Sequence, residues 1–316
     1  MNSFVVMIEL RIFRIEGLFL KVIKLSTVFA IIFLTLGIQP SFAKTEQAID
    51  PNARVLDVID LSDEEISRLK SLGFSNEVIQ DMTWEEYQLQ EGLTGELITT
   101  DEKWFRYNSK TLELEEISEK QALNEYNKFK SNQPININNY WWDPEELSWM
   151  RHITSVSKLN NGRFRLQHQF TWKNQPLVTL QDAVAITYSP HLTYVQNSEY
   201  FRYTYDRWGI NYVDSKNVVK HSADRKSPSA GIGFIYDIVC CDSNYEARNH
   251  RGYMYFDVVV SNSNYSSANA FGHYGHTTLA LGSIGLDLST GSFKITPSLT
   301  TIVTYMRDTG VTFQTK

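Results

Sequence analysis

The chain has very few cysteines. Only two of its 316 residues are cysteines, the adjacent Cys240 and Cys241, which excludes a small fold cross-linked by several disulfides. A large hydrophobic core must therefore stabilise the protein. The pair has two interpretations: neighbouring strand residues, one pointing inward and one outward, or a redox-sensitive vicinal disulfide.

Common catalytic motifs are also missing from the sequence. No stretch matches the H-E-x-x-H, G-x-S-x-G or P-loop patterns, so we predict no catalytic residue, no metal centre and no cofactor. His273 and His276 have an H-x-x-H spacing, but residues three apart in a strand point to opposite faces. A zinc site needs convergent ligands. Gly231 and Gly233 supply only half of a dinucleotide-binding fingerprint, at the start of a predicted strand.

One catalytic arrangement remains conceivable, with Cys240 or Cys241 as nucleophile, His250 as base and Asp257 as the orienting carboxylate. His250 lies in the polar run 248–252. We favour a turn that hydrogen-bonds its own backbone over a catalytic site.

Charge is divided unevenly along the chain. Residues 44–131 contain twenty acidic and ten basic residues, a net charge of −10, whereas residues 132–316 contain fourteen acidic and sixteen basic ones, a net charge of +2. An acidic first part without a later basic cluster argues against a nucleic-acid partner, because that affinity comes from Lys and Arg on phosphate. The change in composition predicts a domain boundary.

Residues 21–43 have the pattern of an export signal. Lys21 and Lys24 precede the uncharged apolar core Leu25–Ile38, and Ser41 and Ala43 provide the small residues of a cleavage site. We predict a signal peptide over 1–43, cleaved after Ala43. The alternative is a membrane anchor, because the apolar window approaches the roughly 20 residues that span a bilayer.

The preceding twenty residues carry four charged side chains, so they fit neither a signal peptide nor a membrane anchor. A start codon assigned too far upstream would explain their presence. No cysteine stands at the cleavage site and no wall-sorting signal stands at the end of the sequence. We therefore expect the mature protein to be secreted and released, with the membrane touched only by the signal peptide.

Residues 44–131 read as an acidic, mainly helical segment. Capping boxes begin at Ser62 and Thr83, and Gly73 is placed to end a helix in a left-handed cap. The clustered Asp and Glu residues lack the spacing of a calcium-binding loop, and the helix dipole explains carboxylates at helix N-termini. A strand over 103–107 and a helix over 117–130 complete the segment.

The run L-G-F-S-N-E-V-I-Q-D-M-T-W-E-E-Y at 72–87 resembles a segment of uncharacterised exported proteins of Gram-positive bacteria. R-N-H-R-G-Y-M-Y-F at 248–256 and A-F-G-H-Y-G-H at 270–276 are similar to the same group. The resemblance implies secretion from a bacterium and no known activity.

Residues 132–150 form a polar linker followed by a short helix that Asp143 and Pro144 are placed to begin. Trp141 and Trp142 precede it. They have two interpretations: an exposed platform on which a sugar stacks, or packing between the two parts of the chain.

From residue 151 onward the hydrophobic period is two. Phe164, Leu166, His168, Phe170 and Trp172 alternate with polar residues, which predicts a half-buried strand with one polar face after a turn at 160–162. The same holds around Tyr203. Further strands are predicted over 232–239, 253–260, 277–288 and 292–307. The fold class is therefore α+β, a small acidic helical segment followed by a mainly antiparallel β-sandwich over 151–316.

Three function classes follow. The first is a secreted, non-enzymatic binding protein for an extracellular glycan, wall polymer or protein, supported by the many Tyr, Trp, Asn and Ser residues. The second is a membrane-active or pore-forming protein that uses the Ser/Thr-rich hairpin 277–305, and the third is a secreted hydrolase. The residues expected to contact a ligand are Trp141, Trp142, Arg248, His250, His273 and His276.

Overall fold

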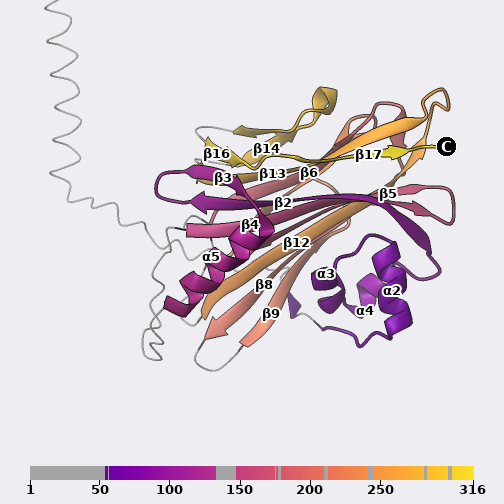
Figure 1. Cartoon of the computed structure of the whole chain (residues 1–316). Coiled ribbons are helices and arrows are strands. Elements are labelled where there is room, and N and C mark those ends of the chain that lie inside the picture. The colour runs from indigo at the N-terminus through magenta and orange to yellow at the C-terminus, as the bar shows by residue number, and fades with distance from the viewer. Residues whose placement is uncertain are drawn as a thin grey trace, which may run out of the picture. The chain divides into compact units, whose positions relative to one another are not determined.

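Antiparallel strands make up most of the structure (Figure 1). The computed structural model describes residues 54–55, 57–132, 147–174, 176, 179–209, 213–240, 245–280, 283–297 and 301–316. The signal peptide 1–43, Trp141, Trp142 and Cys241 lie outside these residues, so the interpretations that rest on them stay predictions. The prediction of a mainly antiparallel β fold is confirmed.

Nine strands form the large sheet. In spatial order they are β1 (Arg54–Val55), β9 (Val213–Lys220), β8 (Tyr200–Gly209), β12 (Tyr245–Val260), β5 (Phe164–Trp172), β4 (Leu147–Leu159), β2 (Gly95–Asn108) and β3 (Glu113–Ile117), with β7 (Leu192–Tyr194) paired to β12. The turn predicted at 160–162 joins β4 to β5, and Gly162 has a φ of +79° there. Because β2 and β3 precede residue 131, the acidic segment contributes strands as well as helices.

Six strands form the small sheet. Their order is β10 (Arg225–Ser227), β11 (Gly231–Asp237), β6 (Gln181–Tyr188), β13 (Ser267–Ala280) and β16 (Thr301–Tyr305), with β17 (Thr309–Gln314) also paired to β13. A separate hairpin consists of β14 (Ile284–Asp287) and β15 (Lys294–Pro297), joined through a 3-10 turn at Ser289–Gly291. The segments 277–288 and 292–307, each predicted as one strand, are thus divided between the small sheet and this hairpin.

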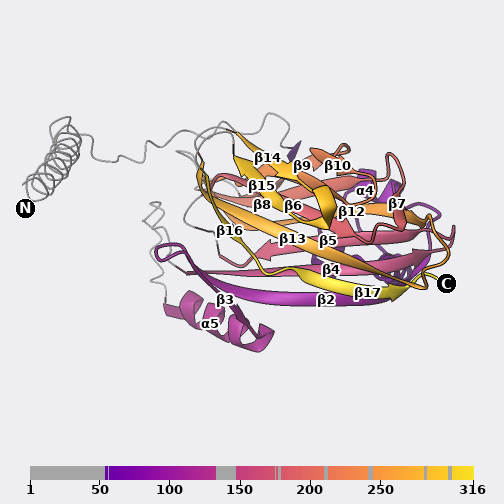
Figure 2. The same cartoon turned by 90° about the horizontal axis from the view of Figure 1, so that it is seen from above.

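The two sheets pack face to face around one aromatic core (Figure 2). The predicted inward set of β5 lies in it, because Phe164, Leu166, Phe170 and Trp172 are at most 2% exposed. Thr154 of β4 meets Thr309 of β17 across the interface, with 2.6 Å between their hydroxyl oxygens. The sheets therefore approach closely where β17 lies against β4.

The polar face of the large sheet is buried too, which corrects the prediction of half-buried strands. Helices α2 (Asp63–Ser71), α3 (Asn76–Gln80) and α4 (Trp84–Gln88) pack on it through an apolar cluster that includes Leu72, Phe74, Tyr253 and Tyr255. Gln167 donates to the carbonyl oxygen of Leu72 at 2.7 Å. Alternation identified the two faces, but it gave no sign that helices cover the polar one.

The capping residues fix these short helices as predicted. The Glu65 carboxylate accepts from the Ser62 amide at 2.8 Å, and the Glu86 carboxylate accepts from the Thr83 amide at 2.8 Å. Gly73 has a φ of +97°, as a left-handed cap requires. The last of the three helices ends at Gln88.

Helix α5 (Glu119–Asn132) packs against the edge of the large sheet, where its partly buried Tyr126 and Phe129 contact Trp149. Its bounds are close to the predicted 117–130. Among the described helices, none is long and apolar enough to cross a membrane.

The run 248–252 was predicted to form a turn. It is instead part of the sixteen-residue strand β12. Its pairing with β8 shifts register between Arg248 and Arg251, and Asn249 has a φ of +52°. An extra residue in one strand produces such a bulge. The polar run 248–252 therefore disturbs the pairing of β12 with β8 but does not end the strand.

Helix α4 is fixed to the large sheet by a buried ion pair. The guanidinium of Arg202 and the carboxylate of Glu86 are each 2% exposed, and the Glu86 carboxylate also accepts from the hydroxyls of Tyr200 at 2.7 Å and Tyr253 at 2.9 Å. Removing one partner of such a pair leaves an uncompensated buried charge.

We predict that Glu86→Gln lowers the free energy of unfolding by about 3–5 kcal/mol, because it strands the buried Arg202 charge while keeping a capping side chain. Arg307→Ala is the control, since Arg307 is 74% exposed in its pair with Glu116, and it should cost less than about 1 kcal/mol. Urea denaturation measures both. Equal losses for the two variants would contradict this account.

Candidate functional site

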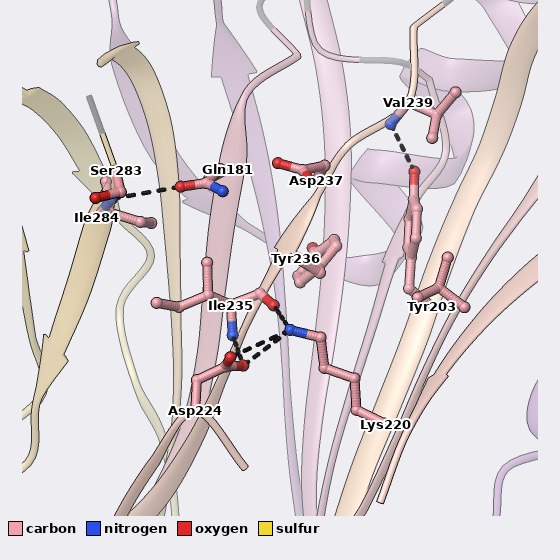
Figure 3. Close-up of a pocket in the computed structure, with 11 residues that line it drawn as sticks. Gln181, Tyr203, Lys220, Asp224, Ile235, Tyr236, Asp237, Val239, Ser283 and Ile284 are labelled. Atoms are coloured by element: carbon pink, nitrogen blue, oxygen red, sulfur yellow. Dashed lines mark hydrogen bonds and ion pairs between the residues drawn. The ribbon is translucent and has the colours of Figure 1, made fainter. Parts of the chain in front are cut away.

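A cavity of about 220 Å³ opens between the two sheets beside β9 and β11 (Figure 3). We call it the edge cavity. Strands of both sheets and the start of β14 line it, with the residues Gln181, Tyr203, Val218, Lys220, Asp224, Ile235, Tyr236, Asp237, Val239, Ser283 and Ile284. Its wall therefore combines tyrosines and aliphatic side chains with a few charged and amide groups.

Two tyrosines of the wall turn their hydroxyls into the protein. The Tyr203 hydroxyl lies 2.7 Å from Nδ1 of His250 and accepts from the Val239 amide at 3.1 Å. The Tyr236 hydroxyl lies 2.7 Å from that of Tyr274. Because these hydroxyls are already hydrogen-bonded, the tyrosines can meet a ligand only through their rings, and Tyr203 is 0% and Tyr236 4% exposed.

Charged groups stand at the mouth of the cavity. Nζ of Lys220 donates to Asp224 at 3.0 Å and to the Ile235 carbonyl oxygen at 2.6 Å, and Asp224 accepts from the Ile235 amide at 2.8 Å. Asp237 is exposed, and Figure 3 shows its carboxylate apart from this network. The mouth thus presents one fixed ion pair and one carboxylate open to a ligand.

A polar network continues inward from Tyr236. Tyr274 accepts from Nε1 of Trp172 at 2.9 Å and donates to Asp182 at 2.5 Å, and Nδ1 of His276 lies 3.1 Å from both oxygens of the same carboxylate. Burial raises the pKa of Tyr203, Tyr236 and Tyr274 well above the ordinary value. These hydroxyls stay protonated and act as donors over the physiological pH range.

The histidines predicted to contact a ligand are buried. His250 and His276 are completely inaccessible and His273 is 4% exposed, so none of the three lies at the surface, and their contact with a ligand stays a prediction. His273 bonds Thr187 at 2.8 Å and Asp308 at 2.7 Å, whereas His276 bonds Asp182. The H-x-x-H pair thus uses different partners, as expected for residues on opposite faces of a strand.

Arg248, which is predicted to contact a ligand, is exposed. Its guanidinium lies 5.5 Å from the ring of Trp208, which is 45% exposed, and pairs with Glu246 at 2.6 Å. This small surface patch is separate from the residues that line the edge cavity.

The conceivable Cys-His-Asp arrangement is not assembled. His250 faces Tyr203 between the sheets, while Asp257 accepts from Nε of Arg165 at 2.8 Å on the side covered by the helices. A histidine and a carboxylate do meet at His276 and Asp182, but both side chains are fully buried. Within the described residues, no group of three or more His, Cys, Asp or Glu side chains has the arrangement of a metal site.

No protein-family model matches the chain, and no curated protein matches it. The resemblance to exported Gram-positive proteins stays a prediction.

Sequence reasoning missed the residues of the edge cavity. Tyr203 was assigned to an inward face, which the structure confirms, but Lys220, Asp224 and Tyr236 carry no recognisable motif. They meet because β9 and β11 each lie next to the end strand of their sheet, beside β1 and β10, on the same side of the sandwich. That juxtaposition depends on strand order, which one sequence does not specify.

The buried histidines predict acid sensitivity. Burial lowers the pKa of His152 and His250 to about 3. The unfolded chain therefore binds protons more readily, and stability present above about pH 6.5 is lost as the pH falls toward 3. At pH 5 each of these histidines should cost about 2 kcal/mol of unfolding free energy.

Calorimetry between pH 7 and pH 5 should show this loss, and His250→Gln should make the decline shallower. His221→Gln is the control, because His221 is 54% exposed. A melting temperature that is independent of pH over this range would contradict the assignment of neutral buried histidines.

Proposed function

We propose that the mature chain acts outside the cell as a non-enzymatic binding protein, and that the edge cavity holds its ligand. The observation that carries this proposal is the composition of the cavity wall, two tyrosine rings beside Lys220, Asp224, Asp237 and Gln181. Small-molecule sites combine apolar and aromatic walls with a few placed polar groups in this way. The export signal predicted over 21–43 from the sequence supports an extracellular setting.

The size of the cavity restricts the ligand. Its volume of about 220 Å³ lies below the roughly 300–1,000 Å³ of sites for drug-sized ligands, and equals the share of about seven liquid waters. A single small unit fits better than an extended chain. Tyrosine rings suit an apolar face and the charged mouth suits hydroxyl groups, so we propose one sugar unit, free or at the end of a glycan or wall polymer.

In this proposal the two packed sheets form a β-sandwich binding domain, and helices α2–α4 are its N-terminal cover. The cover lies on the outer face of the large sheet, away from the aromatic core. The fixed ion pairs beneath it support the strand β8 that carries Tyr203.

Val218→Trp should abolish ligand binding, because Val218 is 5% exposed and lines the cavity. Val259→Trp is the matched control, since Val259 is 37% exposed on β12 and lies outside the lining. Saturation-transfer NMR of the mature protein with a panel of monosaccharides and wall-polymer fragments measures binding. Asp237→Asn, a milder change at the mouth, should weaken binding about tenfold if it removes a charge-assisted hydrogen bond.

Two outcomes would overturn this proposal. One is binding that survives Val218→Trp with Val259→Trp unchanged, which would place the ligand elsewhere. The other is the absence of any transfer signal across the panel for the unaltered protein.

A further inference from the structure

The helical cover of the large sheet (Figure 1) exposes a large aromatic side chain to solvent. Trp84, the first residue of α4, is 58% exposed, more than any other large apolar side chain that the structure describes. Val58 is 46% exposed and forms an antiparallel bridge with Thr83, so it lies beside Trp84. More than half of the Trp84 surface is therefore open to a partner.

The ring of Trp84 is held in a fixed position. It stacks on the ring of Tyr87, with 5.7 Å between the ring centroids and 26° between the planes. The Tyr87 hydroxyl donates to the Glu65 carboxylate at 2.5 Å, and the Arg68 guanidinium lies 5.3 Å from the Tyr87 ring. Hydrogen bonds from Tyr87 and Ser62 lower the pKa of Glu65 to about 2, so this carboxylate is charged at neutral pH. We call the rings of Trp84 and Tyr87 the aromatic pair.

The cover has a strong excess of negative charge. Residues 57–91 include ten acidic and two basic residues, a net charge of −8. Three of the carboxylates, those of Glu77, Asp81 and Glu86, pair with arginines of the large sheet. The other seven carboxylates and the two cations have a net charge of −5. Six of the seven belong to exposed residues: Asp57, Asp60, Asp63, Glu64, Glu85 and Glu91.

Two of these carboxylates belong to neighbours of Trp84. Since the bridge between Val58 and Thr83 is antiparallel, the next step along each strand brings Asp57 beside Trp84. Glu85 follows Trp84 in the chain, and its side chain is 59% exposed at 3.5 Å from Nε2 of His221. An open tryptophan face and two accessible carboxylates therefore occupy the same part of the surface.

This combination selects the charge of the partner. The face of a tryptophan ring attracts cations through its quadrupole, and the carboxylates add attraction of the same sign. A neutral sugar would stack on the ring without using the charge, and an anionic polymer would be repelled. Among protein cations, the guanidinium of arginine both stacks on aromatic faces and pairs with carboxylates.

We propose that the aromatic pair, together with Asp57 and Glu85, docks an arginine from a basic segment of a partner protein. The guanidinium stacks on the open face of Trp84 and donates to the two carboxylates, while further cations of the segment are attracted by the other acidic residues of the cover. The surface lies on the helical cover and shares no residue with the lining of the edge cavity, so this inference is independent of the ligand there.

The test is calorimetric titration of the mature protein with hexa-arginine and with hexalysine, at low and at high salt. Trp84→Ala removes the stacking face. Its matched control is Trp208→Ala, because Trp208 is 45% exposed and its ring already lies 5.5 Å from the Arg248 guanidinium.

A second pair of variants separates local charge from net charge. Asp57→Asn combined with Glu85→Gln removes the carboxylates beside Trp84. Glu96→Gln combined with Glu119→Gln removes two exposed carboxylates elsewhere in the chain, so both double variants change the net charge equally. Circular dichroism confirms that every variant is folded.

We expect hexa-arginine to bind more tightly than hexalysine and to bind more weakly as the salt concentration rises. Trp84→Ala should lower the affinity for hexa-arginine about threefold, as the loss of an exposed cation–π contact implies, and Trp208→Ala should leave it unchanged. The double variant beside Trp84 should lower the affinity about fivefold, and the distant double variant less than twofold.

Four results would overturn the proposal. One is the absence of hexa-arginine binding at low salt, and another is an equal affinity for hexalysine, which would show that stacking plays no part. Equal losses for Trp84→Ala and Trp208→Ala would place the peptide elsewhere. Equal losses for the two double variants would show that only the net charge of the protein attracts it.

Discussion

The interior tyrosines must keep their hydroxyls hydrogen-bonded, and this requirement organises the space between the sheets. A buried hydroxyl without a partner costs several kcal/mol on the harsher transfer scales, about 4–8. Nε1 of Trp172 in the large sheet donates a hydrogen bond to the hydroxyl of Tyr274 in the small sheet at 2.9 Å. The Tyr203 hydroxyl of the large sheet accepts a hydrogen bond from the Val239 amide at 3.1 Å. Directional hydrogen bonds therefore add to apolar packing in holding the two sheets together, and they fix the positions of the tyrosine rings.

The hairpin of β14 and β15 reaches the edge cavity. Ser283 and Ile284, at its start, line the cavity together with Tyr203 and Tyr236. A ligand in the cavity would contact this hairpin on one side and the tyrosine wall on the other, so the hairpin is part of the binding site that we propose.

The sequence was informative wherever a local rule decides the structure. The capping boxes at Ser62 and Thr83, the cap at Gly73, the turn at Gly162 and the inward face of β5 all follow from neighbouring residues. It was uninformative where distant segments meet. Alternation in β5 marks Gln167 as polar and outward, but burial of Gln167 depends on α2 reaching the sheet.

The same limit applies to the site. His273 and His276 stand out by their H-x-x-H spacing and His250 by the polar run 248–252, and neither pattern measures how deeply each ring is buried. Lys220 and Tyr236 belong to strands that are neither consecutive nor paired, so no spacing in the sequence connects them.

The most direct test of the account is fluorine NMR of the mature protein labelled with 3-fluorotyrosine, with and without a bound sugar. Resonances of Tyr203 and Tyr236 should shift on binding, while that of Tyr265, which is 53% exposed and outside the cavity lining, should not. Assignment by single Tyr→Phe variants identifies each signal. Shifts confined to Tyr265 or other surface tyrosines would contradict the claim that the edge cavity is the binding site.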